Sequence, residues 1–205
     1  MKKLYLILAL LLATVFSYAQ TINFCAKAGI NFSTLYLNTP NSAGNGQYIA
    51  GFNAGAIVDI GFANFLIQPG LLYSVKGQKV EVFIGDGNQQ GPSVVSGTER
   101  LNYLELPVNF LYVIKEIKFA KVYVGGGPYV GYGLSVSVSA DGKTTSYSFN
   151  KFQSNPDYGL NALLGAEFKN RILVDAGYGF GLGNVSDGNT LQNRVISVSV
   201  GYMIK

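Results

Sequence analysis

The sequence predicts an all-β fold, an eight-stranded antiparallel up-and-down β-barrel that spans a membrane. Three observations support this prediction. Apolar residues recur at every second position over stretches of about ten residues, which is the period of a β-strand rather than a helix. Short turns and long polar links alternate between these stretches. Aromatic residues gather near both ends of the stretches, with smaller side chains between them.

Eight stretches show this alternation, and each has one apolar face and one small or polar face. In the first stretch, Phe24 and Phe32 share the apolar face, whereas Lys27 and Asn31 lie on the other. In the fifth stretch, the apolar face is expected to continue as far as Val136. The eight predicted strands are residues 23–33, 48–60, 65–76, 103–112, 122–136, 158–168, 172–182 and 196–204.

The connections between the predicted strands are of two kinds. Short turns are expected at residues 61–64, 114–118 and 169–171, and long polar links at residues 34–47, 78–100, 137–156 and 183–193. All four long links would lie at one end of the barrel. This asymmetry, with an even number of strands, is typical of bacterial outer membrane barrels, whose short turns are periplasmic and whose long loops are extracellular. Both termini are then expected in the periplasm.

The composition of the two faces indicates which one meets lipid. A soluble barrel would need a charged outer coat, but the polar face here is mostly glycine, serine and asparagine. The apolar face carries no acidic residue, and its aromatic residues form two groups, as in the girdles at both lipid headgroup levels. One group is Phe24, Phe65, Phe110, Tyr112, Phe168 and Tyr202; the other is Phe32, Tyr48, Phe52, Tyr73, Tyr132, Tyr158 and Phe180.

The first residues have the pattern of a secretory signal peptide. Lys2 and Lys3 precede an apolar run from Leu4 to Phe16, and small residues follow it before Gln20. This run is shorter than the roughly 20 residues that a membrane-spanning helix needs. We therefore expect a signal peptide at residues 1–19 and a single barrel domain at residues 20–205.

The composition excludes several kinds of chemistry. The chain has no histidine and one cysteine, so Ser-His and Cys-His nucleophiles, histidine metal sites and internal disulfides are excluded. Loss of the two lysines of the signal lowers the net charge from +4 to about +2, which does not point to nucleic acid. We expect no enzymatic activity, no catalytic residue, no cofactor and no metal.

The inward face is predicted to carry a small set of charges. An eight-stranded barrel is just wide enough for side chains to fill it, and inward glycines leave room for Tyr103, Tyr123 and Tyr129. Paired carboxylates could perform acid–base chemistry, but no positioned nucleophile accompanies them. A plug of mutually paired charges is favoured, because an unpaired buried charge is costly. The candidate charges are Lys27, Asp59, Lys76, Glu105, Glu167 and Asp175.

Several motifs resemble one family of such barrels. They are Gly29-Ile30-Asn31-Phe32-Ser33, Gln68-Pro69-Gly70-Leu71-Leu72-Tyr73, Tyr103-Leu104-Glu105-Leu106-Pro107 and Gly126-Gly127-Pro128-Tyr129, and they are similar to those of the PorT-like, porin-family outer membrane β-barrel domain of Bacteroidetes. The resemblance covers the whole mature chain and says little about activity.

From the barrel itself we expect a monomer that contacts outer membrane lipid and requires the barrel assembly machinery for insertion. The expected role is structural, adhesive or loop-mediated binding, with an unidentified ligand at the outer loops. The alternative is a narrow channel for small solutes or ions.

Overall fold

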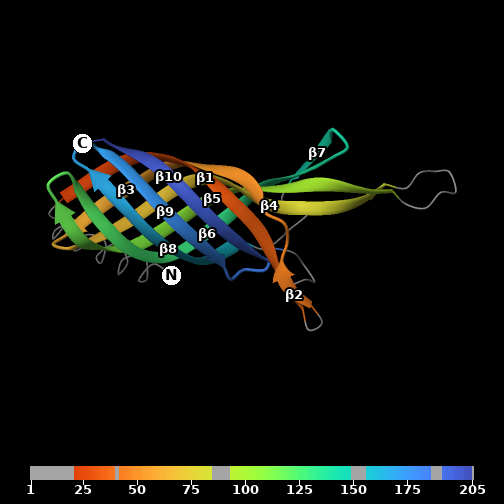
Figure 1. Cartoon of the computed structure of the whole chain (residues 1–205), viewed down its shortest axis with the longest axis horizontal. Helices are drawn as coiled ribbons and strands as arrows, with labels where there is room; N and C mark the ends of the chain where they lie inside the picture. The colour runs from red at the N-terminus through yellow and green to blue at the C-terminus, as the bar shows by residue number, and fades with distance from the viewer. Residues whose placement is uncertain (1–20, 40–41, 85–92, 149–155, 186–190, 205) are drawn as a thin grey trace, which may run out of the picture.

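The computed structural model describes residues 21–39, 42–84, 93–148, 156–185 and 191–204 (Figure 1). The predicted signal peptide, residues 1–19, lies outside the described residues. No helix long and apolar enough to cross a membrane occurs in the described part of the chain.

Eight of the described strands form a closed antiparallel ring, as the sequence predicted. Neighbours in sequence pair with each other, and the ring closes between the first and last strands, from Phe24 with Ile204 to Leu37 with Leu191. Closure gives every strand two neighbours, so no edge is left where the wall would face lipid. The ring strands are β1 (Thr21–Thr39), β3 (Ile49–Phe62), β4 (Phe65–Ile84), β5 (Ser93–Ile117), β6 (Ala120–Ala140), β8 (Asp157–Phe168), β9 (Ile172–Gly181) and β10 (Leu191–Ile204).

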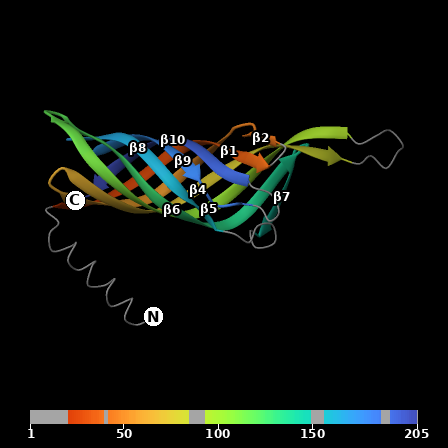
Figure 2. The ribbon, with the colours of Figure 1, turned by 90° about the horizontal axis from the view of Figure 1, so that it is seen from below.

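The two ends of the barrel differ, as Figures 1 and 2 show. At one end, tight turns join β3 to β4, β5 to β6 and β8 to β9. Ala63 and Arg171 in two of these turns have positive φ angles of 49° and 72°, the left-handed conformation that tight turns use. We call this the short-turn end. At the opposite end, which we call the long-hairpin end, strands project beyond the ring.

The prediction of long polar links was wrong in part, because much of their length is strand. β4 and β5 remain paired as far as Ile84 with Ser93. β6 pairs beyond the ring with β7 (Lys143–Ser148), and β1 pairs with β2 (Ser42–Asn45). β7 is rich in serine and threonine and is exposed at every position, and a strand that is solvated on both faces needs no apolar alternation.

The outward face of the ring has the predicted apolar character. Phe65 is 59% exposed at the short-turn end and Tyr132 is 63% exposed toward the long-hairpin end, and every other predicted girdle residue except the half-buried Phe168 is also exposed. The rings of Phe65 and Tyr112 pack at a tilt with centroids 5.2 Å apart, and those of Phe52 and Tyr73 pack at a tilt with centroids 5.7 Å apart.

Val136 is an exception to the predicted facing. The register between β5 and β6 shifts so that Tyr103 pairs with Gly133 while Asn102 pairs with Ser135, which leaves Leu134 as an extra residue. Such a bulge reverses the facing of all later residues in the strand. Val136 therefore points inward and is fully buried, contrary to the prediction from strict alternation.

Three prolines interrupt the ladder along one diagonal of the wall. At Pro69, Pro107 and Pro128 the pairing of β3 with β4, β4 with β5 and β5 with β6 is missing for two residues, although the register is the same on both sides of each gap. Proline has no N–H to donate to the neighbouring strand. We call these residues the proline line.

Candidate functional site

The lumen is filled in three layers. An apolar group near the short-turn end, the short-turn cluster, comprises Cys25, Ile57, Leu111, Tyr123, Leu173 and Met203. A second group near the long-hairpin end, the long-hairpin cluster, comprises Leu35, Leu101, Tyr103, Val136 and Val185. All these residues are at most 2% exposed, so both layers are tightly packed.

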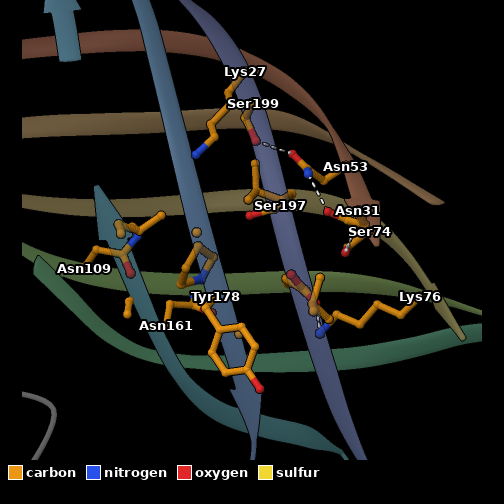
Figure 3. Close-up of a pocket in the computed structure, with 18 residues that line it drawn as sticks. Lys27, Asn31, Asn53, Ser74, Lys76, Asn109, Asn161, Tyr178, Ser197 and Ser199 are labelled. Carbon is orange, nitrogen blue, oxygen red and sulfur yellow. Dashed lines mark hydrogen bonds and ion pairs between the residues drawn. The ribbon is translucent and has the colours of Figure 1, made fainter. Parts of the chain in front are cut away.

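A polar cavity of about 70 Å³ lies within the barrel (Figure 3). Its lining includes lysine, asparagine and serine side chains from β1, β3, β4, β5, β8 and β10. On β9, Gly177 and Gly179 line the cavity, and because they have no side chains the backbone itself faces it. Asn109 lines it and its Oδ1 has no hydrogen-bond donor among the described residues. A polar space of this size has room for ordered water that could supply the missing donor.

Asparagine and serine side chains join four strands across one side of the cavity. Asn53 Nδ2 donates to Asn31 Oδ1 at 2.7 Å, and Asn31 Nδ2 lies 3.1 Å from Ser74 Oγ. On the other side of Asn53, Ser199 Oγ donates to Asn53 Oδ1 at 3.4 Å. This network links β10, β3, β1 and β4, as the dashed lines in Figure 3 indicate in part.

Lys76 is the centre of the largest charged group. Its ammonium forms ion pairs with Glu105 and with Asp157, the latter at 2.9 Å from Nζ to Oδ2. The Tyr129 hydroxyl donates to the same Asp157 carboxylate at 3.3 Å, and the ammonium lies 4.5 Å from the centre of the Tyr129 ring. The ring of Tyr103, at 5.3 Å, joins this group to the long-hairpin cluster. Four strands are thereby tied together around one cation.

A second ion pair joins β1 to β9 on the lumen side of β10. Lys27 Nζ is 2.6 Å from Asp175 Oδ2, and both side chains are nearly inaccessible to solvent. The other Asp175 oxygen, Oδ1, has no hydrogen-bond donor among the described residues. Lys27 of β1 lines the cavity, whereas Asp175 lies on β9, and β10 separates these two strands in the ring.

The two remaining predicted charges take no part in these ion pairs. Asp59 Oδ1 accepts a hydrogen bond from Gln68 Nε2 at 2.8 Å, beside the ladder gap at Pro69. Glu167 is half-buried and borders a shallow hollow near the short-turn end with Lys121, its partner in the β6–β8 register. The structure therefore divides the six candidate charges into two ion-paired groups and two separate carboxylates.

Sequence reasoning missed Asp157 as a member of the Lys76 group. Asp157 lies between the predicted link, which ends at residue 156, and the predicted strand, which begins at residue 158, so neither included it. Continuing the alternation of 158–168 by one residue would have placed Asp157 inward. In the described part of the chain, no three cysteine, aspartate or glutamate side chains come together in a way that could hold a metal ion.

Comparisons with solved structures find distant barrels. The attachment invasion locus protein Ail of Yersinia pestis is 15% identical, with 89% of this chain and 98% of that chain covered and a TM-score of 0.42. Neisserial surface protein A is 16% identical, with coverage of 91% and 99% and a TM-score of 0.48. OprG of Pseudomonas aeruginosa is 12% identical, with coverage of 91% and 97% and a TM-score of 0.38. These likenesses are too distant to carry a residue role across.

The family comparison covers most of the chain. No curated protein matches it in sequence. Residues 18–187, however, match the family described as the outer membrane protein beta-barrel domain. This match agrees with the closed ring of antiparallel strands and with the apolar outward face. The chain therefore belongs to the outer membrane protein beta-barrel domain family.

Proposed function

We propose that this outer membrane barrel is not a diffusion channel and acts through the hairpins at its long-hairpin end, in structural, adhesive or binding contacts. The observation that carries the proposal is the packing of the lumen. A polar cavity is present, but the short-turn and long-hairpin clusters fill the lumen with fully buried apolar side chains. An ion entering either layer would lose its hydration without a replacement, which is strongly unfavourable.

The proposal includes an orientation, with the short-turn end in the periplasm and the long-hairpin end outside the cell. The asymmetry between tight turns and long hairpins supports it. Two single-cysteine variants in a Cys25→Ala background test it, Ser146→Cys on β7 and Asn64→Cys in a short turn, both at exposed positions. A membrane-impermeant maleimide should label Ser146→Cys in whole cells. It should label Asn64→Cys only after the outer membrane is permeabilised; the reverse pattern would contradict the orientation.

The polar cavity is the observation that favours a narrow channel as the second candidate. Planar bilayer recordings separate the two functions. The purified barrel should show no stable conductance steps. Steps in the wild type that disappear in Ser197→Phe, a bulky change in the cavity lining, would support the channel instead.

Other features of the proposal concern chemistry and family. We propose that the barrel is a monomer and not an enzyme, because Lys27 and Lys76 are already ion-paired within a closed lumen. The resemblance of its motifs supports a place among PorT-like proteins, with no part in secretion inferred.

Cleavage of residues 1–19 would give a mature chain that begins at Gln20, which the intact mass of the purified protein tests.

A further inference from the structure

One face of the β6–β7 ribbon carries hydroxyl groups opposite one another. Ser137 Oγ and Ser146 Oγ lie 3.0 Å apart, and Ser139 Oγ lies 2.9 Å from Thr144 Oγ1. The register adds a third pair of the same kind nearer the ring. Each hydroxyl retains bonding capacity beyond its partner, because it has one donor and two acceptor sites. We call this surface the hydroxyl face; it comprises Ser135, Ser137, Ser139, Thr144, Ser146 and Ser148.

The hydroxyl face continues the lipid-facing wall of the barrel. On β6, the exposed Tyr132 pairs with the exposed Leu104, and just beyond the bulge Ser135 pairs with Asn102. Asn102 Nδ2 donates to Ser135 Oγ at 2.8 Å, which places both side chains on the same side. Val136, which alternates with the serines, is buried on the lumen side. Because tyrosine marks the level of lipid headgroups, the hydroxyl face lies at and just beyond that level.

Cationic side chains border the hydroxyl face. Arg100 of β5 pairs with Ser137, and Lys79 of β4 pairs with Thr98, the β5 neighbour of Ser139. Both cations are exposed. The outward positions described within 98–102, 135–139 and 144–148 carry no carboxylate. A guanidinium binds phosphate through two parallel hydrogen bonds, and hydroxyls can donate to and accept from sugar hydroxyls.

We propose that the hydroxyl face, with Arg100 and Lys79, binds the phosphorylated sugar headgroup of a glycolipid in the leaflet around the barrel. The inference rests on the proposed function, because it names the ligand of one outer hairpin. A membrane lipid is the occupant, rather than a free sugar phosphate, because the face is continuous with the wall that contacts acyl chains. A single lipid molecule would place its acyl chains against that wall and its phosphorylated sugar against the hydroxyl face.

The experiment titrates the detergent-solubilised barrel with fluorescently labelled lipopolysaccharide and measures the Kd by anisotropy. Arg100→Gln should weaken binding about tenfold, as expected for loss of a charge-assisted hydrogen bond. Lys143→Gln is the matched control, since Lys143 is an exposed cation of the same ribbon and alternates to its opposite face. This control should bind as the wild type does. Dephosphorylated lipopolysaccharide should bind the wild type as weakly as Arg100→Gln binds the intact lipid.

Three results would overturn the inference. They are unchanged binding by Arg100→Gln, equal weakening by Lys143→Gln, and full displacement of the lipid by an equimolar soluble sugar phosphate. Circular dichroism verifies that each variant is folded, and Arg100→Lys offers a second substitution that retains the charge. Micelles have no inside or outside, so binding is measured independently of orientation. If Ser146→Cys is labelled from outside but lipopolysaccharide does not bind, only this inference fails.

Discussion

Lys76 illustrates, at the scale of a single residue, how a membrane barrel can hold a charge in its interior. The side chain is only 4% exposed, yet its ammonium contacts two carboxylates and the faces of two tyrosine rings. The four partners come from three other strands, β5, β6 and β8, so the desolvation of the cation is offset by contacts that no single strand could supply. The group therefore stabilises the ring as a whole.

Lys76→Met should be strongly destabilising, because it leaves Glu105 and Asp157 as unpaired buried acids. The expected loss in the free energy of unfolding is about 3–5 kcal/mol, measured by urea unfolding in lipid vesicles. Lys79→Met, an exposed lysine three residues along the same strand, is the control and should unfold as the wild type does. Adding Glu105→Gln and Asp157→Asn to Lys76→Met should recover part of the loss. Wild-type stability in Lys76→Met would mean that the ion pairs do not stabilise the barrel.

The alternation of the sequence predicts the face of an inward residue but not its partner. Lys27 and Asp175 were both placed inward, but their contact depends on the closure of β1 on β10 and on the position of β9 beside it. Lys76 meets Asp157 across 81 positions of sequence. A local sequence pattern cannot predict this contact, because the stagger of the strands around the ring decides which inward residues lie close together.

At the scale of the strand, the proline line interrupts the backbone pairing of three neighbouring interfaces of the wall. Interior strands rarely contain proline, because its missing N–H leaves a neighbouring carbonyl unpaired. Here three adjacent strand interfaces share this defect. The register across each gap is preserved, so the strands remain aligned although the pairing is missing at two positions of each interface. The strands β4, β5 and β6 are also those that project farthest beyond the ring on the long-hairpin end (Figure 2).

Pro128→Val should strengthen the β5–β6 interface. Pro128 is exposed on the outward face, so valine meets lipid without steric conflict and returns an N–H to the ladder. The free energy of unfolding should rise by about 1 kcal/mol, the net value of one hydrogen bond, and hydrogen exchange along β5 near Val108 should slow. Val130→Ile, two residues away on the same face, should leave that exchange unchanged. Faster exchange in Pro128→Val would show that the proline is required for the strand geometry.

The strands themselves were predictable where one face meets lipid and the other meets the lumen. The alternation between Ile196 and Ile204 is an example, and it corresponds to the outward and inward positions of β10. It failed for β7, because Lys143 to Ser148 are exposed on both faces and no burial selects a period of two. The alternation also failed at Val136, because the bulge adds one residue to β6 and no change in residue type marks its position in the sequence.

For the whole molecule, the closed ring predicts resistance to unfolding by detergent. Every ring strand is paired on both sides, so SDS can enter only after several interfaces separate together. The unboiled protein should migrate differently from the boiled protein on an SDS gel. Identical mobility before and after boiling would contradict a closed barrel in the membrane.

The pairing of β1 with β10 also limits the order in which the barrel can be completed. Ile30 pairs with Val198, so β1 gains its second neighbour, β10, only when the last strand is present. Until then β1 exposes a row of unpaired amides, which cannot be left in hydrocarbon. Insertion therefore cannot proceed strand by strand from the N-terminus. The first strand must be held by another polypeptide, or kept out of the bilayer, until Leu191 to Ile204 arrive.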